Sequence, residues 1–259
     1  MGEAIASALL GKGTSSPSEI SISEPVAERR DYLKKKYGVT VTGSSRDAVR
    51  GADVVLMSVK PQSLPEVLAQ MEGAVRSDQL VLSIIAGAKI STIREGLKHG
   101  SIVRSMPNTA AQIGMGMTVW TATSEVTLAQ RDSARAILAV MGKEIYVDDE
   151  KSIDMATAVS GSGPAYYFLF AEAWTDAAVN LGLPREMAKA MVLQTMLGSA
   201  RLIETSGKEP AELRQMVTSK GGTTAAALGI FEAGDFKNLV ARAIEAAYKR
   251  ARELGGEKP

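Results

Sequence analysis

The chain has 259 residues and its charges nearly balance, with 30 Lys and Arg against 29 Asp and Glu. This length predicts one large domain or two modest ones, which can bury a core without disulfide support. The net charge of +1 gives no broad positive field, so we expect neither nucleic acid nor a membrane as a partner. The absence of cysteine excludes disulfide frameworks and thiolate metal sites; we predict no metal and expect a cytoplasmic location.

The first half of the chain alternates short β-rich runs with helical patterns. The runs predict strands at residues 20–23, 39–42, 52–59, 80–85, 101–105 and 116–120, and helices at 26–37, 64–71, 90–97 and 128–141. Buried strands separated by helices specify an α/β fold with a doubly wound parallel sheet of the Rossmann type. We place this domain at residues 1–153. The single histidine, His99, follows a helix in a Lys-His-Gly turn, and we expect it to face solvent.

From residue 154 onward the pattern changes to long helices without a clear strand. The run 165–181 is apolar except for Glu172, Asp176 and Asn180, and further helices are predicted at 185–203 and 238–254. We therefore expect an all-helical domain at residues 154–259. A helix with so narrow a polar stripe has more apolar surface than one small domain covers, so part of it is expected to face another subunit.

The first ten residues have the pattern of the helix that follows a glycine-rich phosphate-binding turn. Gly2 takes the place of the last glycine, whereas the preceding strand and the first two glycines are missing. The predicted sheet thereby lacks its central strand. We expect roughly ten further residues upstream, an apolar strand ending in Gly-x-Gly. An ordinary N-terminal helix is the alternative on these residues alone.

Three loops at predicted strand ends carry groups that could bind a ligand. They are residues 59–62, 83–88 and 104–110, and the carboxyl ends of strands are where doubly wound folds bind ligands. The small residues of the second loop would let a planar ring approach the backbone, and the proline, amide and hydroxyl of the third suit a carboxamide. Plain turns and tight strand–helix packing are the alternatives.

Two further loops lie at predicted helix starts. Residues 160–165, Ser-Gly-Ser-Gly-Pro-Ala, combine flexible backbone, cap hydroxyls and a helix-starting proline. Residues 217–224 form a glycine and hydroxyl loop of a kind that exposes consecutive amides to a carboxylate or phosphate. Helix capping is the alternative for both loops.

In this order and spacing, the segments SIIAGAKI, RSMPNTA, AVSGSGPAYYF, LGLPRE and VTSKGGTTAAAL resemble pyrroline-5-carboxylate reductases. The resemblance covers the chain from Met1 to about Leu254. It implies reduction of the cyclic imine 1-pyrroline-5-carboxylate to L-proline, the last step of proline biosynthesis, with hydride from NADPH or NADH. It also implies a homodimer that interleaves through the helical domain, and dimers that often form a ring of five, a decamer.

The resemblance also assigns site residues. Those implied to line the cofactor are Gly2, Val59, Lys60, Pro61, Ala86, Gly87, Met106, Pro107 and Asn108. Those implied to hold the substrate carboxylate and ring nitrogen are Gly221, Gly222, Thr223 and Thr224, with Thr224 as the catalytic residue beside the imine nitrogen. The chemistry asks for little acid–base machinery, because a protonated imine already accepts hydride and positioning supplies most of the rate.

Two alternative functions remain open at this point. The β-hydroxyacid dehydrogenases share the outline but use a lysine on the long helix, and no lysine lies between Pro164 and Pro184. A shortened, inactive relative acting as a binding or scaffold subunit rests only on the missing glycine turn. Cofactor preference is open too: Glu24 would favour NADH and Arg29 and Arg30 would favour NADPH, toward which the family leans.

Overall fold

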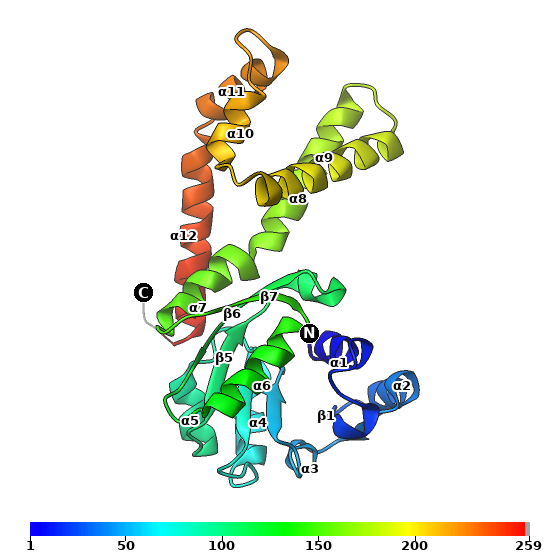
Figure 1. The fold of residues 1–259 in the computed structure, drawn as a ribbon, viewed down its shortest axis with the longest axis vertical. Helices are drawn as coiled ribbons and strands as arrows, with labels where there is room; N and C mark the ends of the chain where they lie inside the picture. The colour runs from blue at the N-terminus through cyan, green and yellow to red at the C-terminus, as the bar shows by residue number, and fades with distance from the viewer. Residues whose placement is uncertain (257–259) are drawn as a thin grey trace. The chain divides into compact units, whose positions relative to one another are not determined.

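The computed structural model describes residues 1–256, which form two compact units. The first unit comprises residues 1–164 with the described residues from 246 onward, and the second comprises residues 165–245. Figure 1 shows strands and helices in the first unit and helices alone in the second. This order confirms the predicted fold class, whereas a domain boundary between residues 153 and 154 stays a prediction.

Two β-sheets lie in the first unit. Five strands pair in the order β3-β4-β5-β6-β7, and β1 pairs with β2 in a separate two-stranded sheet. The strands are β1 (Ser21–Ser23), β2 (Thr40–Thr42), β3 (Val54–Met57), β4 (Leu80–Ser83), β5 (Ile102–Met106), β6 (Gly116–Ala122) and β7 (Gly142–Tyr146). Among the described residues β1 and β3 each pair on one side only. The expected residues before Met1 stay a prediction.

Helices connect these strands. They are α1 (Gly2–Gly11), α2 (Ala27–Tyr37), α3 (Ser45–Ala48), α4 (Leu64–Met71), α5 (Ile90–Leu97), α6 (Leu128–Ala139) and α7 (Lys151–Ala156). The predicted bounds of α4 and α5 are confirmed, because both helices bury apolar residues at helical spacing. The short α3 has no such pattern; it is capped by Ser44, whose hydroxyl accepts a hydrogen bond from the Asp47 amide at 3.2 Å.

One pair of strands departs from the parallel arrangement. β6 runs antiparallel to β5, while the other neighbouring strands are parallel. The connection between them, residues 107–115, is shorter than the dozen or so residues that a parallel crossover needs. The sequence pattern misses β7 because its residues alternate between partly buried and exposed and include Lys143 and Glu144.

The core of the first unit lies on both faces of the five-stranded sheet. Leu80 and Leu82 of β4 join a buried cluster with Trp120 on one face. Val81, between them in sequence, joins a second cluster with Ile93 on the other face. All four residues of β4 are buried, as expected for a strand covered by helices on both sides.

The prediction that His99 faces solvent is wrong. His99 is 6 % exposed, and its Nε2 lies 2.8 Å from the backbone oxygen of Gln79 at the start of β4. Lys98, with φ of +52°, ends α5 and turns the chain so that the imidazole faces inward. The partner lies 20 positions away in the sequence, so the local Lys-His-Gly pattern carries no sign of it.

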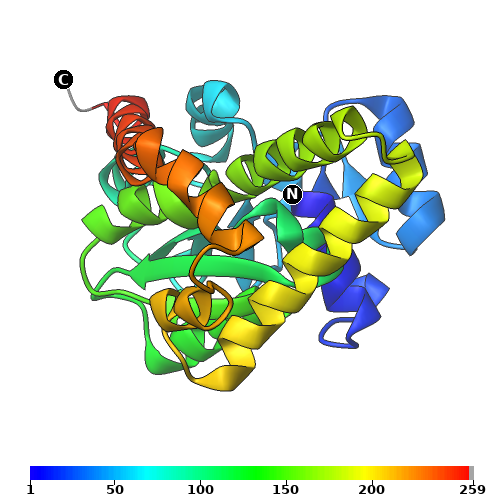
Figure 2. The ribbon, with the colours of Figure 1, turned by 90° about the horizontal axis from the view of Figure 1, so that it is seen from above.

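The second unit consists of helices joined by short turns. The helices of the C-terminal half are α8 (Gly163–Asn180), α9 (Arg185–Ser206), α10 (Pro210–Met216), α11 (Thr223–Ala233) and α12 (Phe236–Leu254). Figure 2 shows α8 and α9 meeting at the turn of residues 181–184. Phe231 of α11 packs against Phe170 of α8 at 6.5 Å between ring centres and against Phe236 of α12 at 5.4 Å.

Candidate active site

Three parallel strands end side by side at one edge of the sheet. β4 pairs in parallel with β3 on one side and with β5 on the other, so the loops that follow these strands begin at the same edge. Residues 59–61, 86–87 and 107–108 lie after these strands, and Met106 is the last residue of β5. The structure thus brings together eight of the nine residues predicted to line a cofactor.

Gly2, the ninth, lies in the first turn of α1, next to the end of β3. A Cβ on Gly2 would lie 2.4 Å from Oγ of Ser58, the first residue after β3. Glycine at this position lets the start of α1 approach the strand closely, which is the role of the last glycine in a dinucleotide-binding turn. The unpaired amides of this first turn lie beside the same sheet edge.

The loop after β4 is small and tightly held. Gly87 has φ of +75°, a left-handed conformation that favours glycine, and its missing Cβ would lie 2.9 Å from Cβ of Leu254. Ala86 and Gly87 are half-buried and carry almost no side chain. The loop therefore fits the approach of a flat ring to the backbone, as the sequence predicts.

Asn108, at the end of β5, links two other segments of the first unit. Its Nδ2 donates to the Ser160 carbonyl at 3.1 Å, and its Oδ1 accepts from the Met117 amide at 3.3 Å. Both ends of the amide are thus engaged with the backbone. The structure places Asn108 as a link that orders the cofactor edge, and its predicted contact with a cofactor stays a prediction.

The Ser160 carbonyl belongs to a π-helical turn, Thr157–Gly161, between α7 and α8. Ser160 does not cap a helix, because its hydroxyl donates to the carbonyl of Ala156 at 3.1 Å inside the helical segment. Gly161 lies close to the end of β5, since a Cβ here would lie 2.8 Å from Cε of Met106. The Ser-Gly-Ser-Gly segment therefore serves close packing against the end of β5. Such π-turns are frequent at functional sites.

A charged cluster that the sequence does not signal surrounds Glu3 in the first turn of α1. Its carboxylate pairs with Arg29 and accepts hydrogen bonds from Tyr37 at 2.8 Å and Lys36 at 3.2 Å. Burial alone would raise the pKa of Glu3. The hydrogen bonds from Tyr37, Lys36 and Arg29 outweigh burial and lower that pKa from 4.5 to about 2.

Glu24, Arg29 and Arg30, the residues considered for cofactor preference, each have different hydrogen-bond or ion-pair partners. Arg29 is neutralised by Glu3, whereas Arg30 donates from Nη1 to the backbone oxygens of Glu24 and Pro25, each at 2.8 Å. The Glu24 carboxylate turns back to accept from the Val26 amide at 3.0 Å. Arg30 therefore places a positive charge at the carboxyl end of β1. Within residues 1–256, this charge forms no ion pair with a carboxylate.

In the second unit, the predicted substrate loop precedes α11. Gly221 has φ of +74°, and Gly222 occupies the cap position of the helix. Thr223 and Thr224 are the first two residues of the helix, so neither hydroxyl is placed to cap it. Thr224 is half-buried. The capping alternative for Thr224 thus loses its geometric basis.

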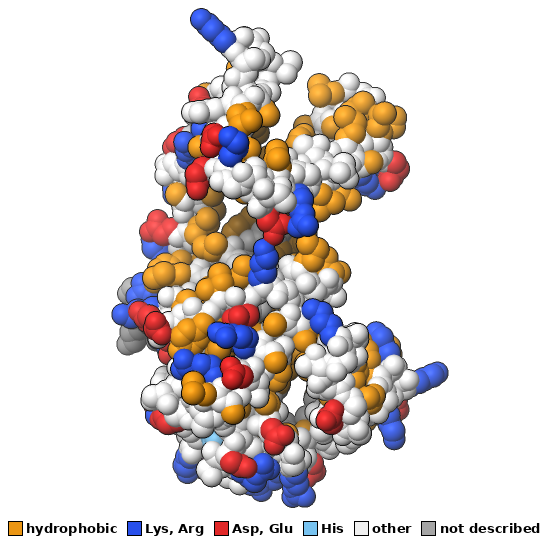
Figure 3. Space-filling view, viewed as in Figure 1, with side chains coloured by type: hydrophobic (Ala, Val, Ile, Leu, Met, Phe, Trp, Pro, Cys, Tyr) orange, Lys and Arg blue, Asp and Glu red, His pale blue; other side chains and the backbone are white. Residues whose placement is uncertain are grey.

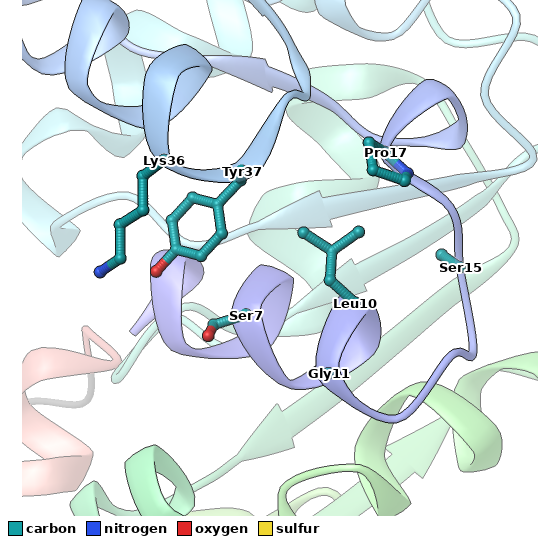
Figure 4. A pocket seen from close by; sticks show the side chains of 7 residues that line it. All are labelled: Ser7, Leu10, Gly11, Ser15, Pro17, Lys36 and Tyr37. Atoms are coloured by element: carbon teal, nitrogen blue, oxygen red, sulfur yellow. The ribbon is translucent and has the colours of Figure 1, made fainter.

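The hollow shown in Figure 4 lies elsewhere in the first unit. It has a volume of about 410 Å³ and is lined by Ser7, Leu10, Gly11, Ser15, Pro17, Lys36 and Tyr37. These residues come from the C-terminal ends of α1 and α2 and the segment after α1. None of them is a predicted site residue, and we assign no function to this hollow.

The second unit exposes much apolar surface, as Figure 3 shows over the helices. Phe168 and Leu169 of α8 are 64 % and 66 % exposed, and Leu181 and Ile230 are exposed to a greater extent. So large an apolar area is typical of a surface that another protein chain covers.

Comparisons with known proteins address the family directly. Residues 150–254 match the model described as pyrroline-5-carboxylate reductase dimerisation. A pyrroline-5-carboxylate reductase from Synechocystis is 42 % identical over 255 residues, covering 98 % of this chain and 95 % of the relative. The chain belongs to the pyrroline-5-carboxylate reductase family. A relative of the same name from Pseudomonas aeruginosa is 43 % identical over 238 residues, which cover 92 % of this chain and 87 % of the relative.

Solved structures of the family give the same result. The Coxiella burnetii reductase has a TM-score of 0.88 at 35 % identity and covers 98 % of this chain and 94 % of its own. The Plasmodium falciparum reductase, solved with NADP bound, has a TM-score of 0.90 at 31 % identity and the same coverage of both chains. Residues 1–87 also match a model described as NADP oxidoreductase coenzyme F420-dependent. In the described part of the chain, no helix has the length and apolar character needed to cross a membrane.

Proposed function

We propose that this chain reduces 1-pyrroline-5-carboxylate to L-proline with hydride from a reduced nicotinamide nucleotide. The observation that carries the proposal is the loop before α11. There the left-handed Gly221 and the cap residue Gly222 leave the amides of Thr223 and Thr224 unpaired at a helix N-terminus. Unpaired amides at a helix start bind a carboxylate, and the adjacent hydroxyls can meet a ring nitrogen.

The chemistry divides between the cofactor and the chain. The reduced nicotinamide supplies a hydride, which with one proton turns the C=N bond of the imine into CH–NH. The residues of the chain bind and orient: Gly221, Gly222 and Thr223 hold the carboxylate, and the Thr224 hydroxyl forms a hydrogen bond with the ring nitrogen. Positioning of this kind supplies most of the rate when the substrate is already a good hydride acceptor.

The cofactor side of the proposal uses the sheet edge of the first unit. The first turn of α1, with Gly2, would hold the pyrophosphate, and the loops of residues 59–61, 86–87 and 106–108 would line the rest of the cofactor. Ala86 and Gly87 fit this use because they leave the backbone open to a flat ring.

We further propose that NADPH is preferred over NADH. The 2′-phosphate of NADPH needs a cation near the end of β1, and Arg30 provides one that no described carboxylate pairs with. Glu24, which would repel that phosphate, is engaged with the Val26 amide at 3.0 Å. A direct comparison of kcat/KM for the two cofactors tests this preference.

The proposal includes assembly and location. The exposed apolar surface of α8 supports a homodimer that forms through the helical domain, and the name of the matching family model supports it too. Five such homodimers would form a decamer. We keep the cytoplasm as the location, since a chain without cysteine suits a reducing compartment. Nothing in the structure favours the inactive scaffold alternative.

The decisive experiment is a steady-state assay of the purified protein. Chemically prepared 1-pyrroline-5-carboxylate and NADPH are mixed with the protein, NADPH absorbance is followed and proline is identified by mass spectrometry. We expect proline to form in proportion to NADPH consumed. Absence of proline with a folded protein that still binds NADPH would favour the scaffold alternative.

A further inference from the structure

A buried cluster of charges joins β5 to α7 in the first unit. Arg104 of β5 is 1 % exposed; its Nη1 donates to Oε1 of Glu150 at 2.9 Å and its Nη2 to Oδ1 of Asp154 at 2.5 Å. Asp154 is buried and Glu150 is one-third exposed at the side chain. Burying such a set is costly, and an apolar substitute often gives equal or better stability. Stability alone therefore does not account for these charges.

Glu150 differs from Asp154 in making a second contact. The same Oε1 atom that pairs with Arg104 accepts a hydrogen bond from the amide of Ile90 at 2.8 Å. Ile90 is the first residue of α5, whose own cap residue, Lys89, gives no side-chain cap and whose first turn has no acidic residue. Glu150, sixty positions away, thus caps α5 and places a negative charge at its N-terminus.

The capped end of α5 follows directly on the loop that contains Ala86 and Gly87. Ala86 and Gly87 contribute almost no side chain to fix the path of this loop, and Gly87 is in the left-handed region. Ala88, the next residue, is buried in the second core cluster. At the β4 end of the loop, the Ser83 carbonyl accepts from the Ser105 hydroxyl at 3.0 Å. At the α5 end, the Glu150 carboxylate, itself paired with Arg104, holds the amide of Ile90.

We propose that Glu150 is a positioning residue for cofactor binding: by tying the Ile90 amide to Arg104, it holds the loop of residues 86–89 in the conformation that receives the nicotinamide. The inference rests on the proposed function, because it takes this loop as part of the cofactor site. Preorganisation of a loop acts on affinity, so losing Glu150 weakens cofactor binding more than it slows the chemical step.

The test compares two carboxylates that share Arg104. Glu150→Ala removes the cap on α5, whereas Asp154→Asn removes only the negative charge beside Arg104, keeps an oxygen that accepts from its Nη2, and leaves the link from Arg104 to Ile90. We expect Glu150→Ala to raise the Kd and KM for NADPH about tenfold, with kcat and the KM for the imine within about twofold. For Asp154→Asn we expect a lower Tm and a Kd for NADPH within about twofold of the unmodified protein.

A second pair of variants isolates the hydrogen bond itself. Ile90→Pro removes the amide donor at a helix position where proline is tolerated, after a Lys89 backbone of φ −70° and ψ 151° that suits a following proline. Ile90→Val keeps the donor and serves as its control. We expect Ile90→Pro, and not Ile90→Val, to reproduce the rise in the Kd for NADPH.

The outcomes separate the inference from the proposed function. If the unmodified protein binds NADPH and Glu150→Ala binds it equally well, the inference is wrong and the proposed function stands. Equal weakening by Asp154→Asn and Glu150→Ala would likewise overturn it, because a general loss of structure would then explain both. If the folded, unmodified protein binds no NADPH, the proposed function fails and the inference fails with it.

Discussion

The missing Cβ of Gly87 would lie 2.9 Å from both the Cβ and the backbone oxygen of Leu254, the last residue of α12. Gly87 is therefore constrained twice: there is no room for a Cβ, and its backbone has φ of +75°, which favours glycine. Backbone atoms of a helix end cannot yield as a flexible side chain does. We infer that this contact fixes the position of the loop of residues 86–89 at the sheet edge.

Gly87→Ala should consequently lower stability by about 2 kcal/mol and raise the KM for NADPH. Gly13→Ala is a matched control, since Gly13 has φ of +66° but nothing within 4 Å of its Cβ position. The control should cost about 1 kcal/mol with no change in KM. Urea unfolding and steady-state kinetics measure both effects, and equal behaviour of the two variants would contradict the role assigned to Leu254.

Thr224 offers the sharpest test of the substrate loop. Because Gly222 holds the cap position, Thr224→Ala should leave the Tm nearly unchanged and lower kcat about tenfold to a hundredfold. Thr224→Ser keeps the hydroxyl and should restore most of the activity. Thr218→Ala is a control, since among residues 1–256 that hydroxyl bonds only to the backbone oxygen of Arg214. A Thr224→Ala variant with normal kcat would remove the residue from the mechanism.

The Glu3 cluster predicts a dependence of stability on pH. Its folded pKa of about 2 lies below the ordinary 4.5, so the carboxylate adds stability above pH 4.5 and loses it as the pH falls toward 2. The side chain is 27 % exposed and solvent screens the interaction, so we expect about 1 kcal/mol at pH 7. Unfolding of Glu3→Gln and the unmodified protein, compared from pH 7 to pH 2, should show this difference vanish at the acidic end.

Arg30 should decide the choice between the two nicotinamide nucleotides. Arg30→Ala is expected to lower kcat/KM for NADPH about tenfold and to leave NADH nearly unaffected, because only NADPH carries the 2′-phosphate. Arg29→Ala, whose charge is paired with Glu3, should change the ratio much less. A preference for NADH in the unmodified protein would contradict the assignment.

Assembly can be tested on the exposed face of α8. Leu169 is 66 % exposed, and Leu169→Glu should shift the protein toward monomer in light scattering at micromolar concentration. Lys12→Glu, an exposed change in the first unit, should leave the mass unchanged. A monodisperse monomer of the unmodified protein would contradict the proposed assembly.

The sequence predicts elements well where one periodic pattern decides them. The bounds of α4 and α5 follow from their buried residues at helical spacing, and β4 follows from the apolar run Leu80–Leu82. β7 escapes prediction, since Glu144 sits in it for reasons of tertiary structure: its carboxylate accepts from the Trp120 indole and pairs with Arg135. Strand residues fixed by such distant partners carry no local signal.

In the candidate site, too, only part of the arrangement could be predicted from the sequence. The loops at strand ends could be located, because the carboxyl edge of a parallel sheet follows from the topology. The hydrogen bonds that hold these loops in place could not be predicted. Asn108 bonds to Ser160, Arg104 to Glu150 and Glu150 to Ile90, over separations of 52, 46 and 60 positions. A single sequence contains no information that pairs residues so far apart.

The assignment of the end of α12 to the first unit has a practical consequence for dissecting the molecule. The chain leaves this unit after residue 164 and rejoins it at 246, and Ala251 is 4 % exposed. A fragment ending at residue 164 would therefore lose the residues that pack beside Gly87 and Lys89. To obtain the first unit alone, residues 246–256 must be kept with it, because simple truncation leaves the loop of residues 86–89 without its contacts to Leu254 and Gly255.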